Sequence, residues 1–209
     1  MKNPLLAGFL KTALDIQELP YAGIRVAHST LMATNGYQLV AYKMPPSAVK
    51  GEGMLHPVTA QVVLAYADVI DAAYDGLEVD KNKVTLKIRP DQHSAHFFSL
   101  PPLACEIKRI ERIFDAFEDA RFVADGFPAK RLLPPDAGEF VKVERGGLVP
   151  ASEEDDWRYS VKQIRKCAEM FRARDELMMS VNSKGFLMCE DEWGRLFVVT
   201  PFRAPQQQS

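Results

Sequence analysis

The sequence predicts an α+β fold of two repeated domains, each with two helices packed on antiparallel sheets. Three observations favour this fold. Helical patterns begin near residues 4 and 57, and they begin again about 100 residues later. Each helical pattern is followed by strand-like runs that turn residues separate. Each half also ends in an aromatic and apolar strand closed by proline, at 96–103 and at 194–203.

The repeat divides the chain into a first domain, residues 1–103, and a second domain, residues 104–209. At a period of about 100 residues, Phe97 corresponds to Phe197 and Asn82 corresponds to Asn182. Identity between the halves is low, so the repeat is one of pattern. The alternative is that both halves belong to one α+β domain and that the spacing coincides by chance.

In the first half, a helix is expected over residues 4–18, because apolar residues recur there at spacings of three and four. Asn35-Gly36 then separates two strand-like runs, one from Ile24 and one from Tyr37. Asn-Gly is a strong hairpin signal, since both residues tolerate positive φ. A second helix opens at Pro57 and is expected to bury a stripe of six side chains: Val58, Val62, Tyr66, Val69, Ile70 and Ala73.

The first half closes with a hairpin and a strand, and the second half repeats this order after a helix expected over 104–118. Glycines and prolines within 120–138 indicate a loop or an edge strand. The acidic run 153–156 complements the N-terminal dipole of a helix expected over 157–173. The strands expected elsewhere are 77–79, 84–88, 95–100, 140–144, 177–181, 186–189 and 195–200.

Size and composition are those of an ordinary globular protein. The 209 residues are 47% apolar and 26% charged. A net charge of −2 argues against a generally polycationic nucleic-acid binder, but it leaves room for one basic face on an acidic body. Cys105, Cys167 and Cys189 form no Cys-x-x-Cys pair, which argues against a zinc knuckle or a disulfide framework.

Targeting signals are not expected. The apolar run near the N-terminus is short and contains Lys11, unlike a signal peptide. No uninterrupted apolar run approaches the ~18 residues of a membrane span. We therefore expect a protein of the reducing cytoplasm that does not contact a membrane.

The sequence lacks the motifs of common enzyme classes. It has neither the phosphate-binding Gly-x-x-x-x-Gly-Lys nor the dinucleotide-binding Gly-x-Gly-x-x-Gly. We expect a protein that is not an enzyme, with no catalytic residues, no cofactor and no metal site. One alternative is a metalloenzyme, since His93 and His96 are spaced as a two-histidine pair and Asp91 is nearby.

Three motifs carry a resemblance to a known family. Residues 33–39, Ala-Thr-Asn-Gly-Tyr-Gln-Leu, resemble the Ala-Thr-Asp-Gly-His-Arg-Leu signature of the bacterial DNA polymerase sliding clamp (beta clamp). Residues 197–203, Phe-Val-Val-Thr-Pro-Phe-Arg, resemble its C-terminal Tyr-Val-Val-Met-Pro-Met-Arg. Residues 125–134 are similar to the connector between its last two domains. Asn35, Tyr37 and Gln38 depart from the signature, where the family has Asp, His and Arg.

The resemblance implies a DNA-clamp-like fold and a processivity factor for DNA replication or repair. The bacterial clamp has three domains, whereas other clamps have two domains per protomer and close as trimers of six domains. A shortened clamp of this kind would encircle duplex DNA as a homo-oligomeric ring, without reading its sequence. The compact form suggests a phage or mobile-element version.

The same resemblance implies an apolar pocket between two domains, which takes short linear peptides from DNA polymerases and repair proteins. Apolar walls, a few polar edges and a rigid floor suit such a peptide site. Carried over residue by residue, the pocket would be lined by Thr34, Gly36, Tyr37, Gln38, Leu39, Pro134, Val198, Val199, Thr200, Pro201 and Phe202.

A clamp that slides must contact phosphates through Lys and Arg and must not read bases. Helices 104–118 and 157–173 offer such a basic face, and its expected DNA-binding residues are Lys108, Arg109, Arg112, Arg158, Lys162, Arg165 and Lys166. The helix that opens at Pro57 has no Lys or Arg. That helix and Gln38 favour an alternative: a clamp-derived monomeric protein-interaction module that does not encircle DNA.

Overall fold

A computed structural model describes residues 4–18, 23–45, 49–70, 74–80, 83–88, 94–98 and 117–203. The α-helices of this part of the chain are α1 (Pro4–Asp15), α2 (Pro57–Ile70) and α4 (Val161–Ala168), and a short 3-10 helix follows β9 at Ala129–Arg131. All the sheets have antiparallel pairs, and one short parallel pair joins β4 to β6. The predicted α+β class is confirmed.

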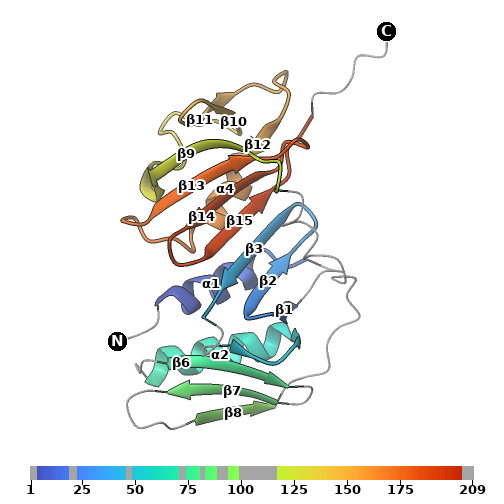
Figure 1. Ribbon diagram of the computed structural model, residues 1–209, viewed down its shortest axis with the longest axis vertical. Coiled ribbons are helices and arrows are strands. Elements are labelled where there is room, and N and C mark those ends of the chain that lie inside the picture. The colour runs from blue at the N-terminus through green and yellow to red at the C-terminus, as the bar shows by residue number, and fades with distance from the viewer. Residues whose placement is uncertain are drawn as a thin grey trace.

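The largest sheet has eight strands in the order β5-β1-β2-β3-β15-β14-β13-β9 (Figure 1). It joins strands from both halves of the sequence, because β3 pairs antiparallel with β15. The bounds are β1 (Ile24–Ala27), β2 (Thr30–Thr34), β3 (Gln38–Lys43), β5 (Gly53–Leu55), β9 (Arg121–Pro128), β13 (Glu176–Val181), β14 (Leu187–Asp191) and β15 (Arg195–Val199).

Two smaller sheets lie at opposite ends of the molecule (Figure 1). One has the order β4-β6-β7-β8, with β4 (Val49–Lys50), β6 (Tyr74–Asp80), β7 (Lys83–Ile88) and β8 (Ser94–Phe98). The other has the order β11-β10-β12, with β10 (Phe140–Glu144), β11 (Gly147–Ala151) and β12 (Arg158–Ser160).

A helix followed by a three-strand meander occurs in each half. The strands β6, β7 and β8 follow α2, and β13, β14 and β15 follow α4. This order agrees with the repeat that the sequence pattern indicates. The expected boundary at 103/104 lies outside the described residues, as does most of the helix expected over 104–118, so the division into two domains stays a prediction.

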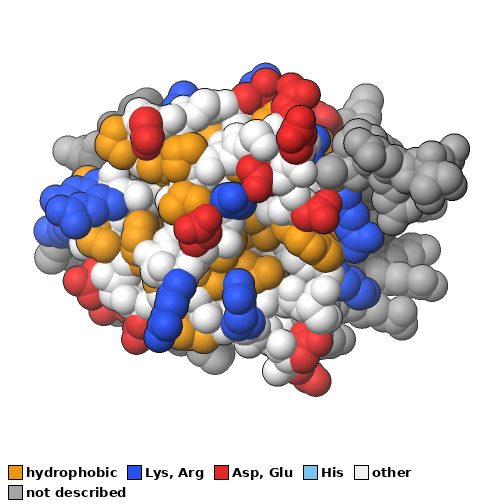
Figure 2. Space-filling model, turned by 90° about the horizontal axis from the view of Figure 1, so that it is seen from above, with side chains coloured by type: hydrophobic (Ala, Val, Ile, Leu, Met, Phe, Trp, Pro, Cys, Tyr) orange, Lys and Arg blue, Asp and Glu red, His pale blue; other side chains and the backbone are white. Residues whose placement is uncertain are grey.

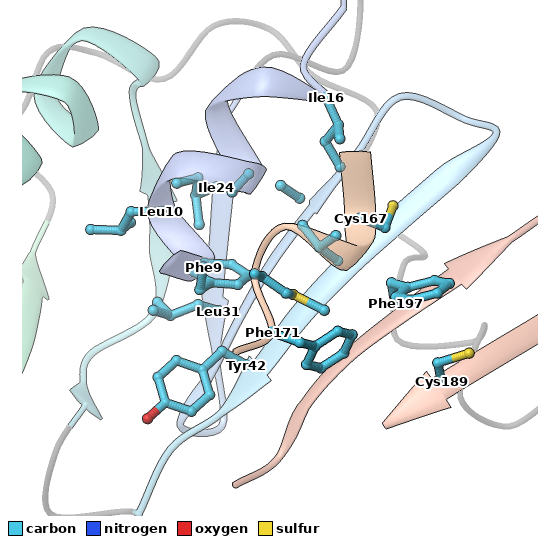
Figure 3. Close-up of a cluster of buried hydrophobic side chains, with 14 of the residues drawn as sticks. Phe9, Leu10, Ile16, Ile24, Leu31, Tyr42, Cys167, Phe171, Cys189 and Phe197 are labelled. Atoms are coloured by element: carbon cyan, nitrogen blue, oxygen red, sulfur yellow. The ribbon is translucent and has the colours of Figure 1, made fainter. Parts of the chain in front are cut away.

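The main core lies between the eight-stranded sheet and the helices α1 and α4 (Figure 3). Phe9 on α1 packs near Tyr42 on β3, with ring centroids 6.2 Å apart, and Phe171 packs 5.9 Å from Phe197 on β15. A smaller cluster covers the opposite face of the same sheet, where the buried residues are Ala27, Met32, Leu39, Ala41, Leu196 and Val198. The sheet is therefore apolar on both faces near its centre.

Two cysteines of the described chain are buried in the core as free thiols, Cys167 and Cys189. Burial raises the pKa of the Cys167 thiol to about 12, since the interior disfavours the thiolate. These two thiols are not paired with each other. Because the thiolate is the reactive form of cysteine, we expect the Cys167 thiol to be unreactive.

A buried ionic cluster ties the β14–β15 turn to the segment that follows α4. The Arg195 side chain is fully buried and donates to Asp191 Oδ2, from Nε at 2.9 Å and from Nη2 at 2.6 Å. It also donates to Asp175 Oδ2 and to the Met170 carbonyl. Burial alone would raise the pKa of Asp175, but hydrogen bonds from Arg172 and Arg195 hold that pKa below its usual value.

The stripe expected on α2 is wrong at its start. Tyr66 packs against the main core as expected, whereas Ala73 lies outside the described residues. Val58 and Val62 are exposed at 47% and 49%, whereas Ala60 and Val63 are buried. The reason is that α2 is apolar on nearly every side, so its periodicity does not fix which face turns inward. The helix α2 lies alongside α1 (Figure 1).

The helix expected over 157–173 is shorter than predicted, since Arg158–Ser160 form β12 and α4 begins at Val161. Ser160 caps it, with its Oγ accepting a hydrogen bond from the Gln163 N–H. The acidic run before it does not cap a helix. Asp155 instead accepts from Lys142 Nζ and from the Ser152 N–H, both at 2.8 Å, and these bonds lower its pKa to about 2.

Besides β12, the strand pattern differs from the expected one in two places. Residues 28 and 29 both have positive φ, 47° and 64°, and this turn splits one expected run into β1 and β2. The second is β11, which follows the turn at Gly146. Residues 121–128, expected to be loop or edge, form β9 at the edge of the large sheet. No described helix is long and apolar enough to span a membrane.

Candidate functional site

The Asn35-Gly36 turn and the end of β15 lie side by side. The Thr200 N–H donates to the Tyr37 carbonyl at 2.9 Å, just before Pro201. This contact extends the pairing of β3 with β15, in which Leu39 faces Val198. Two motifs about 160 residues apart in the chain therefore meet, as the pocket hypothesis requires.

Local hydrogen bonds hold the turn rigid. Asn35 Oδ1 accepts from the N–H groups of Tyr37 and Gln38 at 3.0 and 2.8 Å. Thr34 Oγ1 donates to the Gln38 carbonyl at 2.6 Å, and Gly36 adopts the φ of 90° that favours glycine. The turn therefore presents Tyr37, 60% exposed, on a fixed backbone.

Gln38 is an internal link between the turn and α4. Its Nε2 donates to the Gln163 carbonyl at 2.8 Å and to Cys167 Sγ at 3.3 Å, and its Oε1 accepts from Asn35 Nδ2 at 3.0 Å. The side chain is 3% exposed. Gln38 therefore holds the turn in place and offers no contact to a partner, which corrects its expected role in the pocket lining.

The remaining expected pocket residues divide between the two faces of the sheet. Val199 lies in the main core beside Gln38, on the helix side, so it does not line an outer pocket either. Leu39 and Val198 lie on the opposite face and are 2% and 3% exposed. They can form a floor. The rim residues are Thr34, Gly36, Tyr37, Thr200, Pro201 and Phe202, of which Thr34 is buried.

Phe202 makes contacts that the sequence did not predict. It exchanges backbone hydrogen bonds with Arg158, donating to the Arg158 carbonyl at 2.7 Å. Its ring meets Phe140 edge-on, with centroids 5.8 Å apart. Phe140 and Arg158 lie far from Phe202 in the sequence, so no spacing could have indicated them. Pro134 is half-buried in a turn of its own, closed by Ala137.

The cations of α4 are arranged less uniformly than expected. Lys162 and Arg165 are exposed, and Lys166 donates to the Asp15 carbonyl at the end of α1 at 3.3 Å. Arg158 is a correction, because it lies in β12 with 9% exposure and its guanidinium stacks 5.0 Å from the Phe140 ring. Lys108, Arg109 and Arg112 lie outside the described residues.

Lys162, Arg165 and Lys166 border a hollow of about 530 Å³ beside the start of α4. Glu139 and Glu169 also line it, so the hollow is not purely cationic. The β10–β11 end of the molecule likewise mixes both signs of charge with exposed hydrophobic groups (Figure 2). A DNA-facing role would therefore fall on α4 alone among the described helices.

Nothing in the described part of the chain indicates metal chemistry. No group of three His, Cys, Asp or Glu side chains there could hold an ion. His96 Nδ1 lies 3.1 Å from Thr85 Oγ1, whereas His93 is outside the described residues.

Solved structures with a similar fold are sliding clamps. PCNA from Thermococcus kodakaraensis matches with a TM-score of 0.59 at 12% identity, over 94% of this chain and 96% of that one. A. fulgidus PCNA, solved with the C-terminal region of FEN-1, matches with a TM-score of 0.57 at 12% identity, over 99% and 98%. This chain has a sliding-clamp fold. At such identities the likeness concerns the fold alone.

A bacterial match supplies the size comparison. The DNA polymerase sliding clamp from Pseudomonas aeruginosa matches with a TM-score of 0.50 at 11% identity, over 94% of this chain. Only 64% of that clamp is covered, so this clamp-like chain spans less than two thirds of its length. The shortened clamp suggested by the sequence motifs is thus confirmed as a fold. No family model and no curated protein sequence matches the chain.

Proposed function

We propose that this protein is a processivity factor of DNA replication or repair: a ring of several copies that encircles duplex DNA and binds partner peptides. The observation that carries the proposal is the junction of β3 and β15. There the Tyr37 carbonyl accepts from the Thr200 N–H, and α4 with exposed Lys162 and Arg165 packs against β3 and β15. A tether of this kind raises the local concentration of a polymerase without new chemistry.

The peptide site would lie on the outer face at that junction. Leu39 and Val198 supply an apolar floor, and Tyr37 and Phe202 stand at the rim with 60% and 40% of their surface exposed. Exposed aromatic side chains on rigid backbone make good anchors for a partner. The partners would be DNA polymerases or repair proteins that carry short linear motifs.

Ring closure would use the free edges of the two small sheets. In the described part of the chain β8 and β11 each have one neighbour, and they lie at opposite ends of the molecule (Figure 1). Pairing β8 of one copy with β11 of the next gives a head-to-tail interface, which closes into a ring if the rotation allows. Pro150 cannot donate from β11, so this pairing would be short.

Sedimentation velocity tests the ring directly. At micromolar concentration we expect a closed oligomer, and a trimer would give six domains. A second function would replace the first if the protein stays monomeric over that range. The observation favouring it is α2, whose exposed Val58 and Val62 form an apolar surface where a DNA-facing helix would carry cations. The protein would then be a clamp-derived interaction module.

Truncating the aromatic rim is expected to weaken peptide binding. Peptides would be selected from a random 12-residue library on the wild-type protein, and their affinities measured by fluorescence anisotropy. Tyr37→Ala with Phe202→Ala should weaken them about tenfold or more, because aromatic anchors dominate such interfaces. Trp193→Ala is the matched control, an exposed aromatic in the β14–β15 turn. Equal losses in both variants would place the peptides outside the pocket.

A further inference from the structure

The outer face of the eight-stranded sheet carries an apolar surface beyond the junction of β3 and β15. We name Phe122, Met178 and Met188, together with Ser180 between them, the outer strip. Ser180 is the register partner of Phe122 on β9 and of Met188 on β14, so these three side chains share one face. Phe122 is 57% exposed and Met178 is 39% exposed.

The outer strip is continuous with the floor of the proposed pocket. Met188 is the register partner of Val198, and Val198 is the partner of Leu39. One row of side chains therefore runs across five strands, from Leu39 at the pocket to Phe122 at the sheet edge. A peptide leaving the pocket along this row would meet the outer strip next.

Ser180 has an unmet hydrogen-bonding group. Its residue is 6% exposed, and its Oγ has no hydrogen-bond partner among the described residues. A buried hydroxyl without a partner destabilises the fold. That Oγ has almost no accessible surface, so a peptide on the outer strip would lie over Ser180 without bonding to it.

A hollow of about 450 Å³ adjoins the strip, and Met178 belongs to both. Its charged wall is mostly acidic. Besides Asp191, which is buried and paired with Arg195, four carboxylates line it with one cation, Arg174: Asp125, Glu176, Glu190 and Glu192. Lys43 pairs with Glu190 at 3.2 Å, which leaves the other carboxylates to set the local field. We refer to these four carboxylates as the acidic wall.

We propose that the outer strip and the acidic wall together bind the extension of a partner peptide, in which an apolar residue is followed by Lys or Arg. The apolar side chain packs on Phe122 and Met178, and the cation meets the acidic wall. Charge complementarity selects basic over acidic extensions. The inference extends the proposed peptide-binding function and rests on it for the class of partner.

Two synthetic peptides test the charge preference: acetyl-Gly-Leu-Phe-Gly-Lys-Lys-amide and its counterpart with two Glu in place of the two Lys. Methyl NMR of the methionines would report binding at Met178 and Met188. The Lys peptide should shift both methyl signals, and the Glu peptide should bind about tenfold more weakly or not at all. Glu176→Lys with Glu192→Lys should reverse this order, because both side chains are exposed and the fold is preserved.

Ser180→Ala separates binding from stability. The variant should melt about 2–4 °C higher, since an unpartnered buried hydroxyl is removed, and it should bind the Lys peptide as tightly as the wild type does. Phe122→Ser should weaken binding about tenfold with little change in melting, because the ring is mostly exposed. Unchanged peptide affinity in Phe122→Ser would contradict the strip.

The outcomes distinguish this inference from the pocket proposal. Tyr37→Ala should leave the Lys-peptide shifts at Met178 intact, since these short peptides need only the strip. Shifts that persist in Phe122→Ser, or equal binding of the two peptides, would overturn the strip while leaving the pocket standing. If Phe122→Ser instead changes self-association in sedimentation, the occupant is a second copy of the chain and the peptide inference is wrong.

Discussion

Replacing Arg195 by methionine is expected to lower the free energy of unfolding by about 3–5 kcal/mol. The guanidinium is fully buried and bonds to Asp191, Asp175 and the Met170 carbonyl. Methionine fills much of the same volume but leaves Asp191 without its cation and Asp175 with Arg172 alone. The cost thus arises from the charges left behind, and it should loosen the link between the β14–β15 turn and the segment after α4.

Urea denaturation measures this loss, and Lys43→Met is its control. Lys43 pairs with Glu190 but is half exposed, so its removal should cost at most about 1 kcal/mol. The pH dependence of stability gives a second check. The folded-state pKa of Asp175 is lowered, so its stabilising contribution is present above the unfolded pKa and is lost as pH falls through the folded value. The gap between wild type and Arg195→Met should therefore narrow as pH falls from about 7 to about 3.

If Arg195→Met lowers the free energy of unfolding by less than about 1 kcal/mol, the ionic cluster is not a major source of stability in the second half of the chain. It would mean that the carboxylates find other partners or take up protons. The pH series distinguishes these two cases, because proton uptake would leave a variant whose stability increases as pH falls.

Strong local signals in the sequence predicted much of the fold. The Asn35-Gly36 hairpin formed as expected, because a turn that needs positive φ at short range depends on its own residues. The closing strands β8 and β15 also formed close to their predicted positions. The β1–β2 turn was missed, since positive φ at His28 and Ser29 is uncommon for those residue types.

The orientation of elements was harder to predict than their existence. An almost uniformly apolar α2 has no unique inner face, so Val58 and Val62 were wrongly expected to be buried. In α4 the true start was hidden, because Ser160 caps the helix while an acidic run four residues earlier looked like the cap.

The candidate site depends on pairing between distant strands, which sequence spacing does not specify. Motif resemblance brought Tyr37 and Pro201 to one site, and the contact between Tyr37 and Thr200 agrees with that expectation. It did not distinguish the two faces of a strand. Alternation sends Gln38 and Val199 to the helix side and Leu39 and Val198 to the outer side.

Reversing two charges on α4 is expected to abolish topological retention on DNA. Lys162→Glu with Arg165→Glu changes two exposed cations that would face phosphates. Each lost phosphate contact removes roughly 0.9 from the salt slope of binding, and a ring multiplies the loss by its number of protomers. We expect at least about a tenfold drop in bound protein at moderate salt. The matched control is Arg145→Glu with Lys184→Glu, two exposed cations away from α4.

The DNA substrate can be made to report topology. Protein is mixed with linear duplex, the ends are joined by ligase, and the circles are washed at rising salt and then recut. A ring around DNA is retained on closed circles and slides off when they are cut. Cutting does not change the amount of a protein that is bound only to the DNA surface. If the α4 variant behaves as wild type in both steps, α4 does not face DNA. If wild type itself ignores the cut, the interaction module with its apolar α2 surface becomes the better account, because nothing then requires the molecule to surround its substrate.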